Sequence, residues 1–204
     1  ADNVPPDQFI DEVTDVSPHS AILRFGAPMA ITGASDVILR REGGSNVMLI
    51  ARDPTVALGS AFDEFSLPRA VTVNSIGSAI AKRIRVEVVD FMAIEQGLEA
   101  PLEQFLVADL LSLSRKRQVP ALLAEIDDEV RTRVEADDTA APPILLVLYG
   151  LHRAMDFDME AMDFDTEEDL PGKLSHILVN GPEVGVHVFG WSESLSGLTR
   201  RLPS

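Results

Sequence analysis

Residues 46–59, with the sequence NVMLIARDPTVALG, have the layout of a phosphate-binding loop. An apolar run typical of a buried strand ends in a short loop, and a second apolar stretch then begins at helical spacing. Backbone N–H groups in a loop of this kind, at the start of a helix, can hold phosphate oxygens. A loop that binds a nucleoside triphosphate also uses several glycines and a lysine, but this loop has no lysine and no glycine before Gly59. The layout therefore indicates phosphate chemistry that these residues do not supply.

A second candidate is the acidic segment 155–169, which contains many carboxylates and no basic residue. Four of its acids occupy the first, third, fifth and twelfth positions of an EF-hand calcium loop; they are Asp156, Asp158, Glu160 and Glu167. The sixth position, where the sharp turn needs glycine, is Ala161. We therefore interpret the segment as a solvated insertion whose Phe157 and Phe164 could contact a partner or the domain itself.

Two histidines are candidates for a metal ligand or a general base. His152 follows one apolar run and His187 lies inside another. No second histidine stands at metal-ligand spacing, and no nucleophile is adjacent to either residue. We expect both to be packed, hydrogen-bonded side chains. The motifs of serine esterases and of His-Glu-x-x-His zinc proteases do not occur.

The chain has 204 residues, is 46% hydrophobic, carries a net charge of −16 and contains no cysteine. This length suits one sizeable domain. The lack of cysteine excludes disulfides and cysteine-based zinc sites. It is also compatible with the cytoplasm, where we expect the protein. No run approaches the roughly 20 apolar residues of a membrane span. The negative charge disfavours direct nucleic-acid binding, so we interpret the basic clusters LRREGG, AKRIR, SRKRQ and TRRL as surface charge.

The elements that would position these residues alternate between strands and helices. Residues 1–19 read as a loose arm, and residues 21–44 as a small β-meander. Buried strands are predicted at 46–51, 82–91, 144–150 and 184–191, and helices at 55–65, 101–118, 119–136, 169–181 and 192–202. In the helix over 119–136, a four-residue step places Leu122, Ile126, Val130 and Val134 on one buried face. This alternation predicts an α/β fold with a mostly parallel central sheet and helices on both faces.

Two strings, PPILLVLYGLHRAMDFD and LSHILVNGPEVGVHVFGWSESLSGLTRRL, resemble the FtsK/SpoIIIE family of P-loop translocase ATPases. Gly185, Val186 and His187 stand where that family has Gly-Ile-His. The resemblance covers roughly residues 20–204 and implies a RecA-like P-loop fold that is incomplete at its C-terminal end. At the level of the family it also implies ATP binding, DNA translocation and a role in cell division.

The departures from the family lie at the residues that perform the chemistry. In the phosphate-binding Walker A motif, Ala51 replaces the first glycine, Ala57 the lysine and Leu58 the hydroxyl residue. The degenerate segment consists of Ala51, Arg52, Asp53, Pro54, Thr55, Val56, Ala57 and Leu58. In the Walker B motif, Tyr149 and Gly150 stand in place of the two acids, and Glu193 stands at the sensor position. Since phosphoryl transfer depends on these groups, the resemblance implies a domain without ATP hydrolysis.

We therefore expect a scaffold, regulatory or partner-binding module of a larger protein, with no cofactor. Its expected partners are other domains of the parent chain, a homo-oligomeric ring or a peptide, and Arg200 and Arg201 could act on a neighbour's site. One alternative is an ATPase with an unorthodox site, in which Arg52 replaces the lysine and Asp53 or Glu193 holds Mg²⁺. A second is a peptide-binding pocket where nucleotide would otherwise bind, and a third is an ordinary loop in an unrelated α/β domain.

Overall fold

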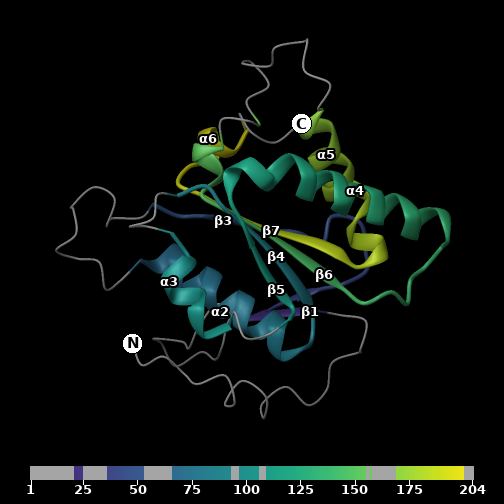
Figure 1. Ribbon diagram of the computed structural model, residues 1–204, viewed down its shortest axis with the longest axis horizontal. Helices are drawn as coiled ribbons and strands as arrows, with labels where there is room; N and C mark the ends of the chain where they lie inside the picture. Colours follow the sequence, from purple (N-terminus) through teal and green to yellow (C-terminus); the bar gives the residue numbers. More distant parts are fainter. Residues whose placement is uncertain are drawn as a thin grey trace.

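The protein is described by a computed structural model that covers residues 21–24, 36–52, 66–92, 97–105, 109–154, 157 and 169–199. Its centre is a five-stranded sheet in which every neighbouring pair of strands is parallel, in the order β3-β7-β6-β4-β5 (Figure 1). The strands are β3 (Val47–Ile50), β4 (Arg85–Asp90), β5 (Leu111–Ser114), β6 (Ile144–Tyr149) and β7 (Val186–Ser192). The predicted α/β class with a mostly parallel sheet is confirmed.

Helices cover both faces of this sheet, as Figure 1 shows. On one face α4 (Val119–Glu135) and α5 (Leu170–Asn180) pack on the apolar side chains of β6 and β7. On the other face lie α2 (Leu67–Ala81), α3 (Glu99–Leu102), the short helix η4 (Glu103–Phe105) and the antiparallel pair β1 (Ala21–Arg24) and β2 (Asp36–Leu39). The short elements η5 (Lys116–Gln118), η6 (Leu151–Arg153), η8 (Pro182–Val184) and α6 (Leu195–Thr199) follow strands or helices.

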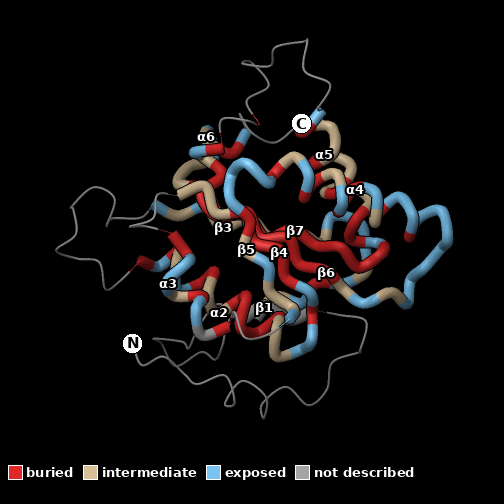
Figure 2. The backbone as a smooth tube through the Cα atoms, in the orientation of Figure 1, coloured by how far each residue is buried: buried red, intermediate tan, exposed pale blue. Residues whose placement is uncertain are grey.

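The middle strands β6 and β7 are buried along their whole length, which Figure 2 shows as red tube between the two helical layers. Strands buried on both faces carry continuous apolar runs, and this is why the sequence of these two strands predicted them. Helix α4 was also predicted, and its apolar positions differ in burial. Leu122, Ile126 and Val130 are buried, whereas Val134 is 47% exposed because it lies in the last turn of the helix.

The prediction of a single helix over residues 101–118 is wrong. This region contains α3, η4, the strand β5 and η5 instead. Leu111 and Leu113 alternate with serines, and β5 pairs with β4 in a register that joins Val86 to Leu111. The leucines have helical spacing, but hydrogen bonding to β4 favours a strand here. Because β4 is distant in sequence, local spacing could not reveal this pairing.

Helix α2 was not predicted from the sequence, because its β-branched residues and its glycine are unfavourable in helices. It begins after Ser66, whose hydroxyl accepts a hydrogen bond from the N–H of Arg69 at 3.3 Å. Its small residues allow close packing, since a Cβ on Gly77 would lie only 3.1 Å from the ring of Phe105. The buried hydroxyls of the helix, including Ser75, donate to carbonyl oxygens one turn earlier and so remain hydrogen-bonded.

The predicted arm 1–19, the helix 55–65 and residues 155, 156 and 158–168 of the acidic segment lie outside the described residues. The last residue of that segment, Asp169, is the N-cap of α5, and its Oδ1 accepts from the N–H of Gly172 at 2.8 Å. None of the described helices is long and apolar enough to cross a membrane.

Candidate functional site

The carboxyl ends of the parallel strands meet at one edge of the sheet, which is where open α/β sheets bind ligands. The strand register places four residues in one row at this edge. Leu49 of β3 pairs with Trp191 of β7, Trp191 pairs with Tyr149 of β6, and Tyr149 pairs with Asp90 of β4. Of the residues singled out in the sequence, Ala51, Tyr149, Gly150 and Glu193 come together here. We refer to this region as the carboxyl edge.

Tyr149 and Trp191 form a buried aromatic pair at the centre of the carboxyl edge. Their ring centroids are 4.6 Å apart at an interplanar angle of 33°, and both residues are 0% exposed. The indole Nε1 of Trp191 donates a hydrogen bond of 2.9 Å to the carbonyl oxygen of Ala51, the first residue after β3. The position expected to hold the first Walker B acid is therefore filled by a packed ring. Sequence reasoning did not single out Trp191, although a lone tryptophan at the end of an apolar strand was a signal.

Gly150, which the sequence comparison placed at the second Walker B position, has a left-handed backbone with φ of +84°. A Cβ at this position would lie 2.8 Å from the Sδ of Met92, so Met92 covers the residue closely. A glutamate here would strain the backbone and collide with Met92. The local structure at the end of β6 thus suits glycine and does not suit a catalytic acid.

Asp90 explains the position of Met92. Its Oδ1 accepts from the N–H of Met92 at 2.8 Å and its Oδ2 accepts from the N–H of Leu98 at 2.6 Å. Burial raises the pKa of Asp90, and the two backbone hydrogen bonds and the charge of Arg69 act in the opposite direction. Both oxygens of this carboxyl group shape the turn after β4. Sequence reasoning missed Asp90 because one acid at the end of a strand has no distinctive pattern.

His152 and Glu193 meet on the other side of the aromatic pair. The backbone N–H of Glu193 donates to the Nδ1 of His152 at 3.3 Å, so the proton of the neutral ring is on Nε2, 3.9 Å from Glu193 Oε1. The imidazole also packs edge-on against Trp191, with centroids 5.2 Å apart. Burial lowers the pKa of His152, Glu193 raises it and Arg153 lowers it. The prediction of a packed, hydrogen-bonded histidine is confirmed.

Arg52 is exposed at the carboxyl edge, two residues after β3. The other Walker A positions, Asp53, Pro54, Thr55, Val56, Ala57 and Leu58, lie outside the described residues, as do Arg200 and Arg201. Phe157 is described and is fully buried, with its ring 5.9 Å from that of Phe91 in an edge-on contact, so it contacts the domain itself. Within the described ranges, no group of three or more histidine, aspartate or glutamate side chains could hold a metal ion.

At the amino end of β7, His187 and Asn46 hold β3 in place. The Nδ1 of His187 donates to the carbonyl oxygen of Ser45 at 2.8 Å, and burial lowers the pKa of this histidine. Asn46 accepts from the N–H of Val188 and donates to the carbonyl oxygen of Leu178, each at 2.8 Å. The prediction that His187 is a packed, hydrogen-bonded side chain is therefore confirmed as well.

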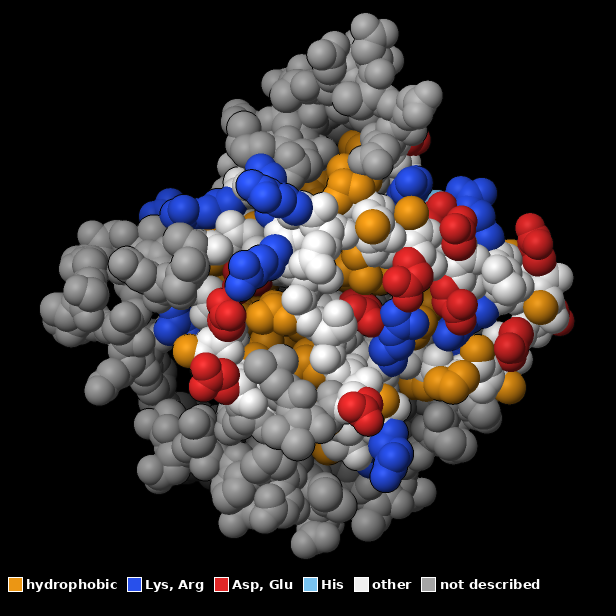
Figure 3. All heavy atoms as spheres, viewed as in Figure 1, with side chains coloured by type: hydrophobic (Ala, Val, Ile, Leu, Met, Phe, Trp, Pro, Cys, Tyr) orange, Lys and Arg blue, Asp and Glu red, His pale blue; other side chains and the backbone are white. Residues whose placement is uncertain are grey.

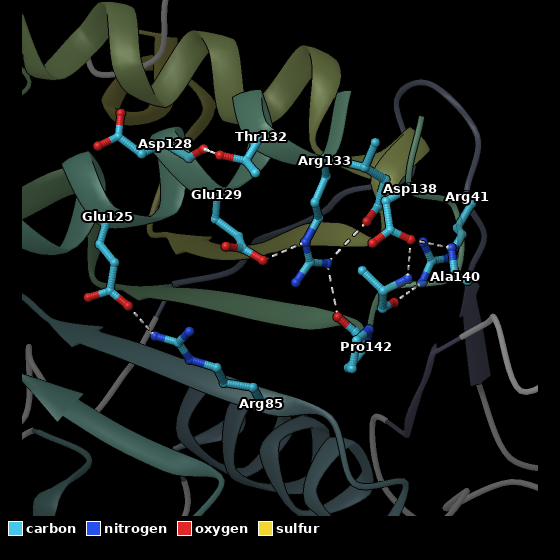
Figure 4. A network of polar contacts seen from close by, with 12 residues as sticks. Arg41, Arg85, Glu125, Asp128, Glu129, Thr132, Arg133, Asp138, Ala140 and Pro142 are labelled. Carbon is cyan, nitrogen blue, oxygen red and sulfur yellow. Dashed lines mark hydrogen bonds and ion pairs between the residues drawn. The ribbon is translucent and has the colours of Figure 1, made fainter. Parts of the chain in front are cut away.

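The polar network in Figure 4, like the hydrogen bonds of His187 and Asn46, connects segments of the fold. Arg133 of α4 donates to the carbonyl oxygens of Pro142, at 2.9 Å, and Val184, at 3.2 Å, and its Nε bonds Glu129 at 2.8 Å. Asp138 accepts from the N–H groups of two residues in the following turn. The network joins the end of α4 to the segments that lead into β6 and β7. It therefore stabilises the amino edge, opposite the candidate site.

No family model matches the chain, and no curated protein matches it in sequence. Three solved structures are similar to it. The monomer form of the pCW3 conjugation coupling protein TcpA, with ATPγS, matches with a TM-score of 0.60 and 12% identity over 98% of this chain and 57% of that chain. The cytoplasmic domain of EssC matches with a TM-score of 0.50 and 13% identity over 94% of this chain and 35% of that chain. The cytoplasmic domain of the Thermomonospora curvata type VII secretion ATPase EccC matches with a TM-score of 0.50 and 15% identity over 94% of this chain and 23% of that chain.

The chain therefore shares the α/β fold of these three structures, with a parallel central sheet covered by helices. The expectation that followed from the GPEVGVHVF segment and its neighbours is confirmed at the level of the fold. The chain spans a little over half the length of the TcpA chain, at 57%, and less of the other two. At identities of 12–15% these likenesses show the fold alone.

Proposed function

We propose that this chain is a translocase-type ATPase domain that does not hydrolyse ATP and acts as a scaffold or partner-binding module. One observation carries the proposal. At the end of β6, where the two Walker B acids are expected, Tyr149 is stacked in the core on Trp191, and the left-handed Gly150 is covered by Met92.

The chemistry of hydrolysis explains why this arrangement matters. One Walker B carboxylate helps to hold Mg²⁺ and the next polarises the attacking water, so catalysis rests on their position and charge. A buried aromatic pair can supply neither function. Of the described acids nearby, Asp90 is already engaged, because its carboxyl group accepts two backbone hydrogen bonds.

The parent protein is proposed to belong to the translocation class. The resemblance to the FtsK/SpoIIIE family supports DNA as the cargo of that class, whereas the likeness to the secretion ATPase EccC supports protein. In either case an active motor domain would lie elsewhere in the assembly, and this module would contact it or the cargo.

Calorimetric titration with ATP and Mg²⁺, combined with a phosphate-release assay, tests the proposal. We expect no micromolar binding and no phosphate release above the rate without protein. Micromolar binding with turnover that is lost in Arg52→Ala, Asp53→Asn or Glu193→Gln would overturn it in favour of the unorthodox ATPase site. Glu42→Gln is the matched control for the Asp53 and Glu193 variants, because Glu42 is exposed at the opposite edge and its replacement removes the same negative charge.

A further inference from the structure

Three arginines lie along the carboxyl edge and are exposed to solvent. Arg52 follows β3, Arg117 lies in η5 after β5, and Arg153 lies in η6 after β6. We refer to these three residues as the arginine rim. Because parallel strands end at one edge of their sheet, residues that are far apart in sequence come to one side of the molecule. In Figure 3, Lys and Arg side chains gather toward the upper left of the face shown, where the strands of Figure 1 end.

Several other arginines of the protein are held in ion pairs, although the exposed Arg83 near the amino edge forms none within the described ranges. Arg85 pairs with glutamates at 2.5 and 2.7 Å, Arg131 with Asp127 at 2.9 Å, and Arg133 with Glu129 at 2.8 Å. Within the part of the chain that the structure describes, the rim arginines form no ion pair. The chain has 33 acidic side chains against 17 basic ones, so partners for three arginines are abundant in the sequence. Unpaired cations at one edge of such an acidic protein indicate a surface that accepts an external anion.

The sheet order gives the spacing of the rim. One strand, β7, separates β3 from β6, and one strand, β4, separates β6 from β5. With about 4.8 Å between neighbouring strands, the ends of the three strands that precede these arginines are spaced roughly 10 Å apart along the edge. The rim is therefore a line of charge about 20 Å long and not a single pocket.

We propose that the arginine rim binds an acidic segment of a partner protein that runs across the ends of the strands. This proposal deepens the partner-binding role given above and rests on it. A polyproline II segment rises about 3.1 Å per residue with three residues per turn, so an acid at every third position faces the same side at about 9 Å intervals. That interval matches the spacing of the strand ends that carry the rim, and each carboxylate can make a charge-assisted hydrogen bond to a guanidinium.

Two observations favour a protein partner over a nucleic acid. A polyanion as long as DNA is repelled by the net charge of −16, whereas a short peptide is repelled much less. The same edge also exposes Ile50 by 45% and Leu195 by 61%; Ile50 of β3 pairs with Ser192 of β7, three residues before Leu195. Aliphatic side chains of this kind contact apolar groups of a protein and have no counterpart along a phosphate backbone.

The test uses the whole chain and a fluorescein-labelled peptide of about twelve residues with glutamate at every third position, separated by serine and proline. Fluorescence anisotropy measures its dissociation constant for the wild type, for Arg52→Gln/Arg117→Gln/Arg153→Gln, and for the control Arg40→Gln/Lys82→Gln/Arg83→Gln. Both variants lose the same charge, but the control residues are on segments that lead into β3 and β4 at the amino edge. Circular dichroism confirms that each variant is folded.

We expect the rim variant to bind at least about tenfold more weakly and the control to stay within about twofold, with all binding weaker at high salt. An isomeric peptide with its glutamates contiguous should bind the wild type more weakly than the spaced one. Equal weakening in both variants, no binding of the spaced peptide, or tighter binding of a single-stranded oligonucleotide would each overturn the inference.

ATP with Mg²⁺ separates this inference from the proposed function. If ATP is hydrolysed while the peptide still binds in an arginine-dependent way, the proposed lack of hydrolysis is wrong and the rim is upheld. If ATP with Mg²⁺ displaces the peptide, the rim serves nucleotide and the inference is wrong.

Discussion

Trp191 ties the start of the loop after β3 to the centre of the sheet, so its replacement by phenylalanine is a direct test of the carboxyl edge. The change keeps a ring that can stack on Tyr149 and removes the Nε1–H that bonds the carbonyl oxygen of Ala51 at 2.9 Å. The variant therefore tests how much the hydrogen bond and the outer part of the indole contribute to stability, while the stacking on Tyr149 is kept.

The expected cost follows from two contributions. Loss of the hydrogen bond costs about 1 kcal/mol, because Ala51 is only half-buried and water can partly replace the indole. The smaller ring leaves a void at a fully buried position, which costs about 1–2 kcal/mol. The sum is a decrease of roughly 2–3 kcal/mol in the free energy of unfolding, whereas Trp191→Ala, which also loses the stacking, should cost about 3–5 kcal/mol.

Urea unfolding followed by circular dichroism measures these free energies, and amide hydrogen exchange reports on the loop. The N–H of Ala51 bonds the carbonyl oxygen of Ser192 at 3.2 Å, so it should exchange faster in Trp191→Phe. The reasoning would be refuted if Trp191→Phe stayed within about 0.5 kcal/mol of the wild type with unchanged exchange at Ala51.

Two further predictions concern the glycine after β6 and the buried histidines. Gly150→Ala should lower the free energy of unfolding by about 2–3 kcal/mol, since the left-handed backbone and the contact with Met92 both resist a Cβ; Gly44→Ala, with φ of +79° and open space around it, should cost only about 1 kcal/mol. Equal losses of stability in the two variants, measured by urea unfolding, would refute the role of Met92. Burial lowers the pKa of His187 and of His152 in the folded state, so below about pH 6.5 the unfolded chain takes up protons that the folded chain does not. Stability should therefore be fully present above pH 6.5 and fall toward pH 5, with a smaller fall in His187→Gln, and an identical pH profile for the variant would contradict this assignment.

The central strands and α4 were predictable because their signal is local. The run ILLVLY of β6 has no polar alternation, which is the pattern of a strand buried on both faces, and the leucine and isoleucine spacing of α4 is that of a helix. The presence of Tyr149 and Gly150, and of no acid, at the end of β6 was also evident, because it depends only on residue type. Those features needed no knowledge of distant neighbours.

Other features depend on contacts between residues that are far apart in the chain. Residues 111–114 are a strand because β4 offers them a hydrogen-bonding edge, although their spacing also suits a helix. The aromatic pair at the carboxyl edge exists because the register joins Tyr149 to Trp191, and Asp90 positions Met92 over Gly150 through two backbone hydrogen bonds.

The sequence by itself therefore determined the fold class and the lack of an acid at Tyr149 and Gly150, since both depend on residue type and local periodicity. Only the tertiary structure decided which side chains occupy the carboxyl edge of the sheet and which arginines line it. The physical reason is that parallel strands bring their carboxyl ends together irrespective of their separation in sequence, so the environment of each end depends on strand order and register.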